Sequence, residues 1–144
     1  MSIKLKIDGF DDLLREIQKA GGDVDSVMKK CLRESASIMQ NELKTQMREA
    51  NVPNHMIEEM PAPELEGDYG VLTARVGYKK GAFDPQNPSI GYKVVFLNYG
   101  TPERTKHGKV VGRGFIQKAK KKALPKIRKA QEQALKDALK GLKQ

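Results

Sequence analysis

Hydrophobic and polar residues alternate at the start of the chain. Ile3, Leu5 and Ile7 are separated by Lys4 and Lys6. This period of two predicts a half-buried strand. The lysines suit a solvent-facing side or a sheet edge.

Two helices are predicted to follow. Apolar residues at helical spacing mark the first helix over residues 10–20, and Gly21-Gly22 end it. Asp23 can cap the second helix, which runs to about Ala50. The apolar stripe of this long helix consists of Val24, Val27, Met28, Cys31, Leu32, Met39, Leu43 and Met47.

The middle of the chain predicts loops and two strands. Residues 69–78 alternate, with Leu72, Ala74, Val76 and Tyr78 on one face, and a second strand is expected over residues 90–99, where residues 94–99 form an apolar run. We expect these two segments to pair as antiparallel strands. Mobile loops are expected near residues 51–68, 79–89 and 101–114, where Pro and Gly are frequent.

A last helix is predicted from Phe115 to the end. Its apolar face consists of Ile116, Ala119, Ala123, Ile127, Ala130, Ala134 and Ala138. The opposite face consists of Lys118, Lys122, Lys126, Lys129, Lys136, Lys140 and Lys143. Pro125 should kink or restart this helix. Phe115 should be a buried anchor between the helix and the sheet.

Length and composition indicate one domain over residues 1–144 with a thin core. Apolar residues make up 38% of the chain and charged residues 31%. A thin core is often completed by partner subunits. The predicted fold class is α+β: a small, mainly antiparallel sheet packed by a long central helix and a C-terminal amphipathic helix.

The net charge of +9 lies in the last segment. From Arg113 onward there are eleven Lys or Arg and two acids, and the preceding residues balance at sixteen of each sign. A lysine stripe is usually only a solvated face. Because few acids lie between these lysines, their charges repel one another and favour an anionic neighbour. That neighbour can be DNA, an acidic partner or the acidic segment within residues 51–68. The candidate interaction residues are Arg104, Lys106, His107, Lys109, Arg113, Lys122, Lys129, Lys136, Glu58, Glu59 and Glu64.

Signatures of catalysis are missing from the sequence. His55 and His107 have no motif partners, and the run G-K-V-V-G-R-G lacks the spacing of a phosphate loop. Cys31 lies on an apolar helix face, where a buried, unreactive thiol is expected. We therefore expect no enzyme, no cofactor and no metal. No run reaches transmembrane length and no signal peptide is recognised, so a cytoplasmic protein that does not enter membranes is expected.

One stretch resembles a known family. In this stretch an apolar run leads into Tyr99-Gly100-Thr101, a loop follows, and an aromatic residue then begins a helix. This order resembles that of the tail-completion or head–tail joining proteins of long-tailed phages and prophages. The matching residues are Phe96, Tyr99, Gly100, Thr101, Phe115 and Ala119. The chain departs from this pattern at Asn98, where an acid is frequent, and at Gly114, where proline is frequent.

The resemblance implies a structural subunit of a virion, assembled in the host cytoplasm. Such a subunit acts at the head–tail junction or upper tail by forming an oligomeric ring. Its partners would be itself, the phage connector, and tail-tube or terminator proteins, with a possible non-specific contact to DNA. The alternative is a non-specific nucleic-acid-binding module that uses the basic C-terminal helix.

Overall fold

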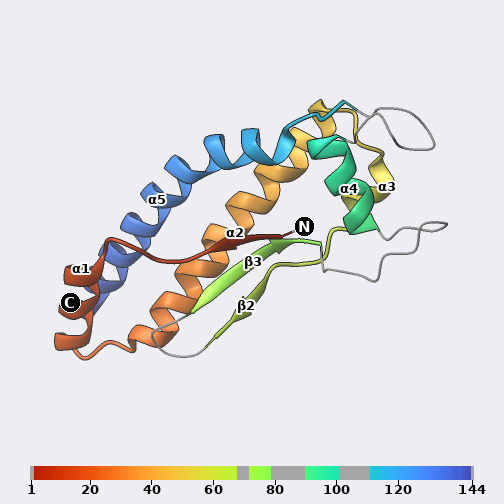
Figure 1. Cartoon of the computed structure of the whole chain (residues 1–144). Helices are drawn as coiled ribbons and strands as arrows, with labels where there is room; N and C mark the ends of the chain where they lie inside the picture. Colours follow the sequence, from red (N-terminus) through yellow and green to blue (C-terminus); the bar gives the residue numbers. More distant parts are fainter. Residues whose placement is uncertain (1, 68–71, 79–89, 101–110, 144) are drawn as a thin grey trace.

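Helices and one small sheet build the chain in two layers (Figure 1). A computed structural model describes residues 2–67, 72–78, 90–100 and 111–143. In chain order the elements are β1 (Ser2–Leu5), α1 (Asp11–Lys19), α2 (Val24–Glu49), α3 (Asn54–Glu58), β2 (Glu64–Glu66), β3 (Thr73–Gly77), α4 (Ile90–Tyr99) and α5 (Phe115–Leu142). The sheet lies on one side of α2, and α5 runs along α2. The predicted α+β class is confirmed.

The sheet has the order β1-β3-β2, and both pairings are antiparallel. The predicted alternation is confirmed, since Leu72, Ala74, Val76 and Tyr78 are all buried. The predicted pairing of residues 69–78 with residues 90–99 is wrong. β3 is instead the central strand, with β1 on one side and β2 on the other. All three strands contact α2.

Residues 90–99 form the helix α4, and the predicted strand is wrong. A short apolar run rich in valine and aromatic residues does not distinguish a strand from a buried helix by periodicity. In the structure Gly91, Val94 and Asn98 are buried, which is the three-and-four spacing of one helix face. Packing of this face outweighs the β preference of the individual side chains.

Residues 51–68 were expected to be a loop, but they contain α3 and β2. The reason is that this acidic segment also has apolar residues to bury: Met56, Ile57 and Met60 belong to the core. The Tyr78 hydroxyl donates a hydrogen bond to the Met56 carbonyl and so ties the end of β3 to α3. Burial raises the pKa of Tyr78 to about 12. The other predicted loops, 79–89 and most of 101–114, lie outside the described residues.

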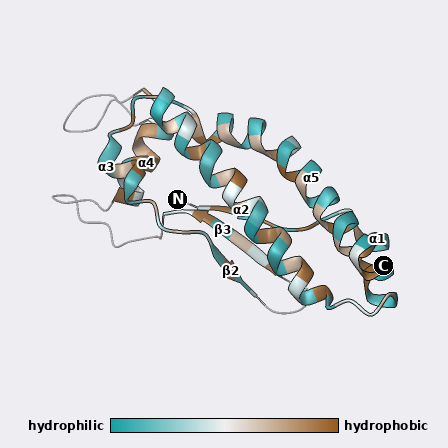
Figure 2. Ribbon diagram, turned by 180° about the vertical axis from the view of Figure 1, so that it is seen from behind, coloured by the Kyte–Doolittle hydropathy of each residue, from teal (hydrophilic) through white to brown (hydrophobic). Residues whose placement is uncertain are grey.

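The long helix α2 has the expected bounds, and it buries the expected stripe from Cys31 onward, whereas Val24, Val27 and Met28 are only partly buried. Asp23 is its N-cap, and its side chain accepts a hydrogen bond from the Ser26 amide at 3.3 Å. Leu32, Met39, Leu43 and Met47 are fully buried. These residues make α2 the centre of the main hydrophobic core (Figure 2).

The last helix, α5, buries every fourth residue. This set consists of Phe115, Ala119, Ala123, Ile127, Gln131, Leu135 and Leu139. A spacing of four drifts around a helix of 3.6 residues per turn. The first half of the helix therefore packs into the main core, and Leu135 and Leu139 pack with Ile17 of α1. Helix α5 continues through Pro125, so of the two predicted effects, a kink or a restart, the restart does not occur.

Phe115 is completely buried, as predicted. Its expected partner was the sheet, and this part of the prediction is wrong. α5 packs chiefly against α2, and Phe115 lies beside Gln46 and Ala50 near the C-terminal end of that helix. The anchor therefore holds two helices together.

Candidate assembly surface

The junction between α4 and α5 is held by backbone and side-chain hydrogen bonds to Asn98. Its Oδ1 accepts from the Ile116 amide at 2.8 Å, and its carbonyl accepts from the Gly114 amide at 3.0 Å. Asn98 is 2% exposed, and its Nδ2 is buried with no hydrogen-bond partner in the described part of the chain. Asn98 thus caps α5 from another helix, because Gly114 at the N-cap position has no side chain.

Glycine is required where the returning chain meets α4. Gly100 and Val111 form an antiparallel bridge, and the Arg113 amide donates to the Leu97 carbonyl at 2.9 Å. A Cβ on Gly112 would lie 2.7 Å from the carbonyl carbon of Tyr99. Only a residue without a side chain fits this approach without a shift of backbone.

Arg113 is used inside the subunit. Its guanidinium donates to the carbonyl oxygens of Ala50 at 3.0 Å and Asn51 at 3.2 Å. These carbonyls lie at the C-terminal end of α2, where a positive charge is favourable. The structure therefore gives this predicted interaction residue an intramolecular capping contact.

Three large apolar side chains are exposed at this junction. Phe96 is 37% exposed, Tyr99 62% and Val111 73%. Phe96 and Tyr99 are one turn apart on α4, and Val111 pairs with the next residue, Gly100. We call these three residues the α4 patch. Exposed apolar residues that gather at one place are typical of a protein–protein contact.

The predicted lysine face of α5 is exposed along its whole described length. Lys122 and Lys129 have no ion pair with any described residue, whereas Lys136 pairs with Glu132 at 2.9 Å on the same helix. Lys126 bonds Glu42 of α2 at 3.3 Å. A hydrogen bond from Gln46, and then the contact with Lys126, lower the pKa of Glu42.

The predicted acidic residues lie on elements other than α5. Glu58 ends α3, Glu59 follows it, and Glu64 begins β2. No ion pair joins these three carboxylates to α5 within the described residues. The remaining predicted residues, Arg104, Lys106, His107 and Lys109, lie outside the described residues.

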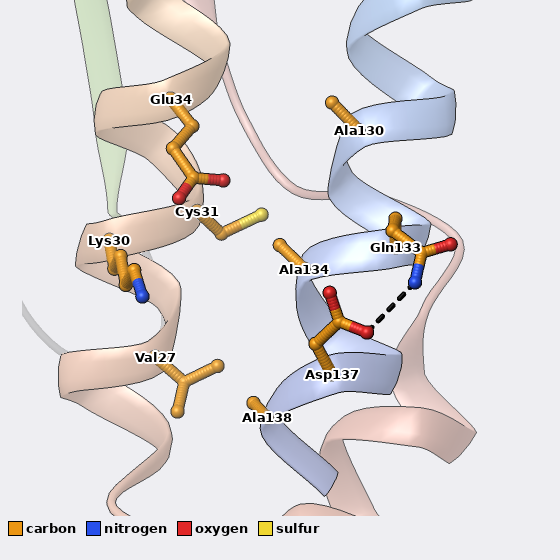
Figure 3. A pocket seen from close by; sticks show the side chains of 9 residues that line it. All are labelled: Val27, Lys30, Cys31, Glu34, Ala130, Gln133, Ala134, Asp137 and Ala138. Carbon is orange, nitrogen blue, oxygen red and sulfur yellow. Dashed lines mark hydrogen bonds between the residues drawn. The ribbon is translucent and has the colours of Figure 1, made fainter. Parts of the chain in front are cut away.

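A groove of about 430 Å³ separates the C-terminal half of α5 from α2 (Figure 3). Ala130, Ala134 and Ala138 line the α5 side, and the Cys31 thiol points toward them from α2. Burial, and secondarily Glu34, raise the pKa of Cys31 to about 11. The thiol is therefore protonated at neutral pH, in agreement with the predicted unreactive cysteine.

Two buried polar residues near this groove were missed by the sequence analysis. Ser35 donates to the Cys31 carbonyl at 2.8 Å and accepts from Gln131 of α5 at 3.0 Å. Gln131 also approaches the Lys6 carbonyl at 3.4 Å. The position of Gln131 in the four-residue repeat of α5 was the available signal, because it continues the series of buried residues.

Comparisons of the chain with protein-family models, curated proteins and solved structures gave no significant match. None of the described helices is both long and apolar enough to cross a membrane. The described His, Cys, Asp and Glu residues form no group of three that could hold a metal ion. The described residues offer two candidate interaction surfaces, the α4 patch and the lysine face.

Proposed function

We propose that this chain is a structural subunit of a phage or prophage virion, placed at the head–tail junction or upper tail, which acts by assembling into an oligomeric ring. The resemblance to tail-completion and head–tail joining proteins supports this proposal. Its partners are other copies of itself and the connector, tail-tube or terminator proteins of the virion. The proposed function requires no catalysis.

The observation that carries the proposal is the exposure of the α4 patch. Phe96 and Tyr99 belong to the family-like stretch, and both have large apolar surfaces open to solvent. The hydrogen bonds of Asn98 join α4, which carries both side chains, to the start of α5. Rigid aromatic side chains contribute much of the binding energy in protein interfaces because little entropy is lost when they are covered.

A second candidate function is non-specific binding of nucleic acid, and it rests on the lysine face. Only Glu132 and Asp137 offset the positive charges of α5. Lysines along one helix face can contact phosphates, and contacts with phosphates carry no sequence information. The α5 face has no exposed aromatic side chain for stacking, which makes sequence-tolerant phosphate contact the only expected mode.

Assembly and duplex binding can be measured on the same samples. We expect light scattering to show a mass that rises with concentration for the parent and falls for Tyr99→Ser with Val111→Ser. Leu142→Ser is the matched control, since Leu142 is also exposed, at 39%, but lies at the far end of α5. Loss of the patch removes apolar area that is buried only in the assembly.

A separate variant tests the second candidate function, the non-specific binding of nucleic acid. Reversal of Lys122, Lys129 and Lys136 to Glu should abolish duplex binding if the lysine face binds phosphates. A parent that binds duplex tightly with a steep salt dependence, and stays monomeric at every concentration, would contradict the ring proposal and favour the alternative.

A further inference from the structure

We propose that neighbouring copies of this chain join through the two outer edges of the sheet, with β2 of one copy pairing alongside β1 of the next. This inference rests on the proposed function, because it adds the sheet edges to the α4 patch as surfaces through which copies in the ring meet. The occupant of each edge is therefore a second copy of the same chain.

No other described strand pairs with the outer edge of β1 or of β2. Among the described residues, β1 and β2 each pair only with β3. An open edge presents backbone donors and acceptors that another strand can use. Because β1 and β2 are both antiparallel to β3, they run in the same direction. If a second copy is related to the first by a rotation about an axis parallel to the strands, β2 of the first copy lies parallel to β1 of the second. This contact is head-to-tail, and a repeated head-to-tail contact can close into a ring.

The two edges have opposite charge on the solvent face of the sheet. Lys4, Arg75 and Glu64 form one row across the three strands. Glu66 also lies on β2, and its carboxylate bonds Arg75 at 3.2 Å, while Arg33 lies below this edge. The row is thus positive at β1 and negative at β2. Complementary charges at two edges favour pairing between unlike edges and oppose pairing between like edges.

A groove of about 290 Å³ accompanies the positive edge, between β1 and α5. Lys4, Lys6 and Arg128 line it against one acid, Asp8. It also contains Leu124, which is 49% exposed although it is a large apolar residue in the middle of α5. The helix layer thus extends beyond the sheet on this side and presents an apolar side chain there.

The negative edge has a recess of its own. This recess, of about 340 Å³, lies between β2 and α2, and it is lined by Ala36, Pro63 and Leu65 together with Arg33, Ser37 and Gln40. In the proposed pairing we expect the exposed Leu124 of the next copy to face this recess and to contact its apolar residues.

Engineered cysteines test the pairing directly. Adjacent strands are about 4.8 Å apart, so β1 and β2 of one chain are separated by roughly 10 Å and cannot be bridged, because a disulfide needs Cα atoms about 4.4–6.8 Å apart. We expect Lys4→Cys combined with Glu64→Cys, or with Glu66→Cys for the other register, to give a ladder of linked chains on a non-reducing gel. Reductant should collapse this ladder to single chains.

The single variants are the controls for direction. Lys4→Cys alone and Glu64→Cys alone should give no linked chains beyond the parent, because each edge meets only the other edge. Dimers from a single variant would overturn the inference in favour of a symmetric contact. A parent that assembles while neither double variant forms a ladder would overturn the edge pairing and leave the proposed function in place. A parent that never assembles would contradict both.

A variant away from the sheet gives an independent readout. Leu124→Lys should lower the oligomer mass seen by light scattering, because a lysine would lose the contact with Pro63 and Leu65 and would be repelled by Arg33 in the same recess. Leu142→Lys is the control, as another exposed leucine of α5 remote from both sheet edges. Equal oligomer masses for the parent and Leu124→Lys would contradict the inference.

Discussion

The two long helices of this chain begin in different ways. α2 starts at its own cap, Asp23, whose carboxylate accepts from the Ser26 amide three residues later. α5 starts after Gly114, which has a φ of 62° and no side chain, and its cap comes from Asn98 on α4. One helix start is local in sequence, whereas the other depends on a contact with a different element.

This difference explains which parts of the fold can be predicted from the sequence. A local cap followed by a long apolar repeat is a signal contained in one stretch of sequence. A cap supplied by Asn98 exists only after α4 has formed and packed. The N-terminal end of α5 and the helix α4 therefore depend on each other, and we expect substitutions there to have the largest effects on stability.

The largest expected effect belongs to Phe115→Ala. Phe115 is fully buried at the start of α5, so its truncation should leave a cavity between α5 and α2. We expect a loss of about 3–5 kcal/mol in the free energy of unfolding, measured by chemical denaturation. Leu124→Ala on the same helix is the control, because that side chain is half exposed and should change stability little. Similar losses for both variants would show that the helix start has no special role.

A smaller effect is expected when the remote cap is removed. Asn98→Ala leaves the buried Ile116 amide without its acceptor, which should cost about 1–2 kcal/mol in the free energy of unfolding. Asn98→Asp keeps an acceptor at the positive end of α5 and removes the unpaired Nδ2. It should therefore retain more stability than Asn98→Ala in the same denaturation experiment. Equal losses for the two variants would mean that the hydrogen bond to Ile116 is not what matters at this position.

Sequence periodicity predicted much of the fold but not its connections. The bounds of α2, the N-terminal strand and the buried face of β3 follow from apolar spacing in single stretches. The strand predicted for residues 90–99 failed because a short, mostly apolar segment fits either element, and burial of Gly91, Val94 and Asn98 decided in favour of a helix. β2 has only three residues, Glu64–Glu66, and such a strand exists because β3 offers it an edge.

The candidate surfaces were predicted in part. The lysine face of α5 follows directly from its spacing and is exposed. Arg113 was predicted for the same basic surface, but its guanidinium caps α2, a contact that depends on how residues 113 and 50 meet in space. The opposite charges of the sheet edges were also not predicted, since Lys4 and Glu64 are brought into one row only by the strand order.

The smallest expected effect concerns the local cap at Asp23. Hydrogen bonds from the Ser26 hydroxyl and then from its amide lower the pKa of the Asp23 carboxyl below its ordinary value. A carboxyl with a lower pKa in the folded state stabilises that state above its unfolded pKa, about 3.9, and this contribution is lost as the pH falls through the folded value.

The pH dependence separates a charged cap from a neutral one. Asp23→Ala should melt at a lower temperature than the parent at pH 7, and the difference should shrink below about pH 4, where the parent carboxyl becomes protonated. Asp23→Asn keeps an oxygen acceptor that does not titrate, so it should hold its advantage over Asp23→Ala at both pH values. The melting temperatures of the parent and Asp23→Ala could instead differ by the same amount at pH 7 and at pH 2. The ionised carboxylate would then not be the cap of α2, and α2 would not have the local cap that distinguishes its start from that of α5.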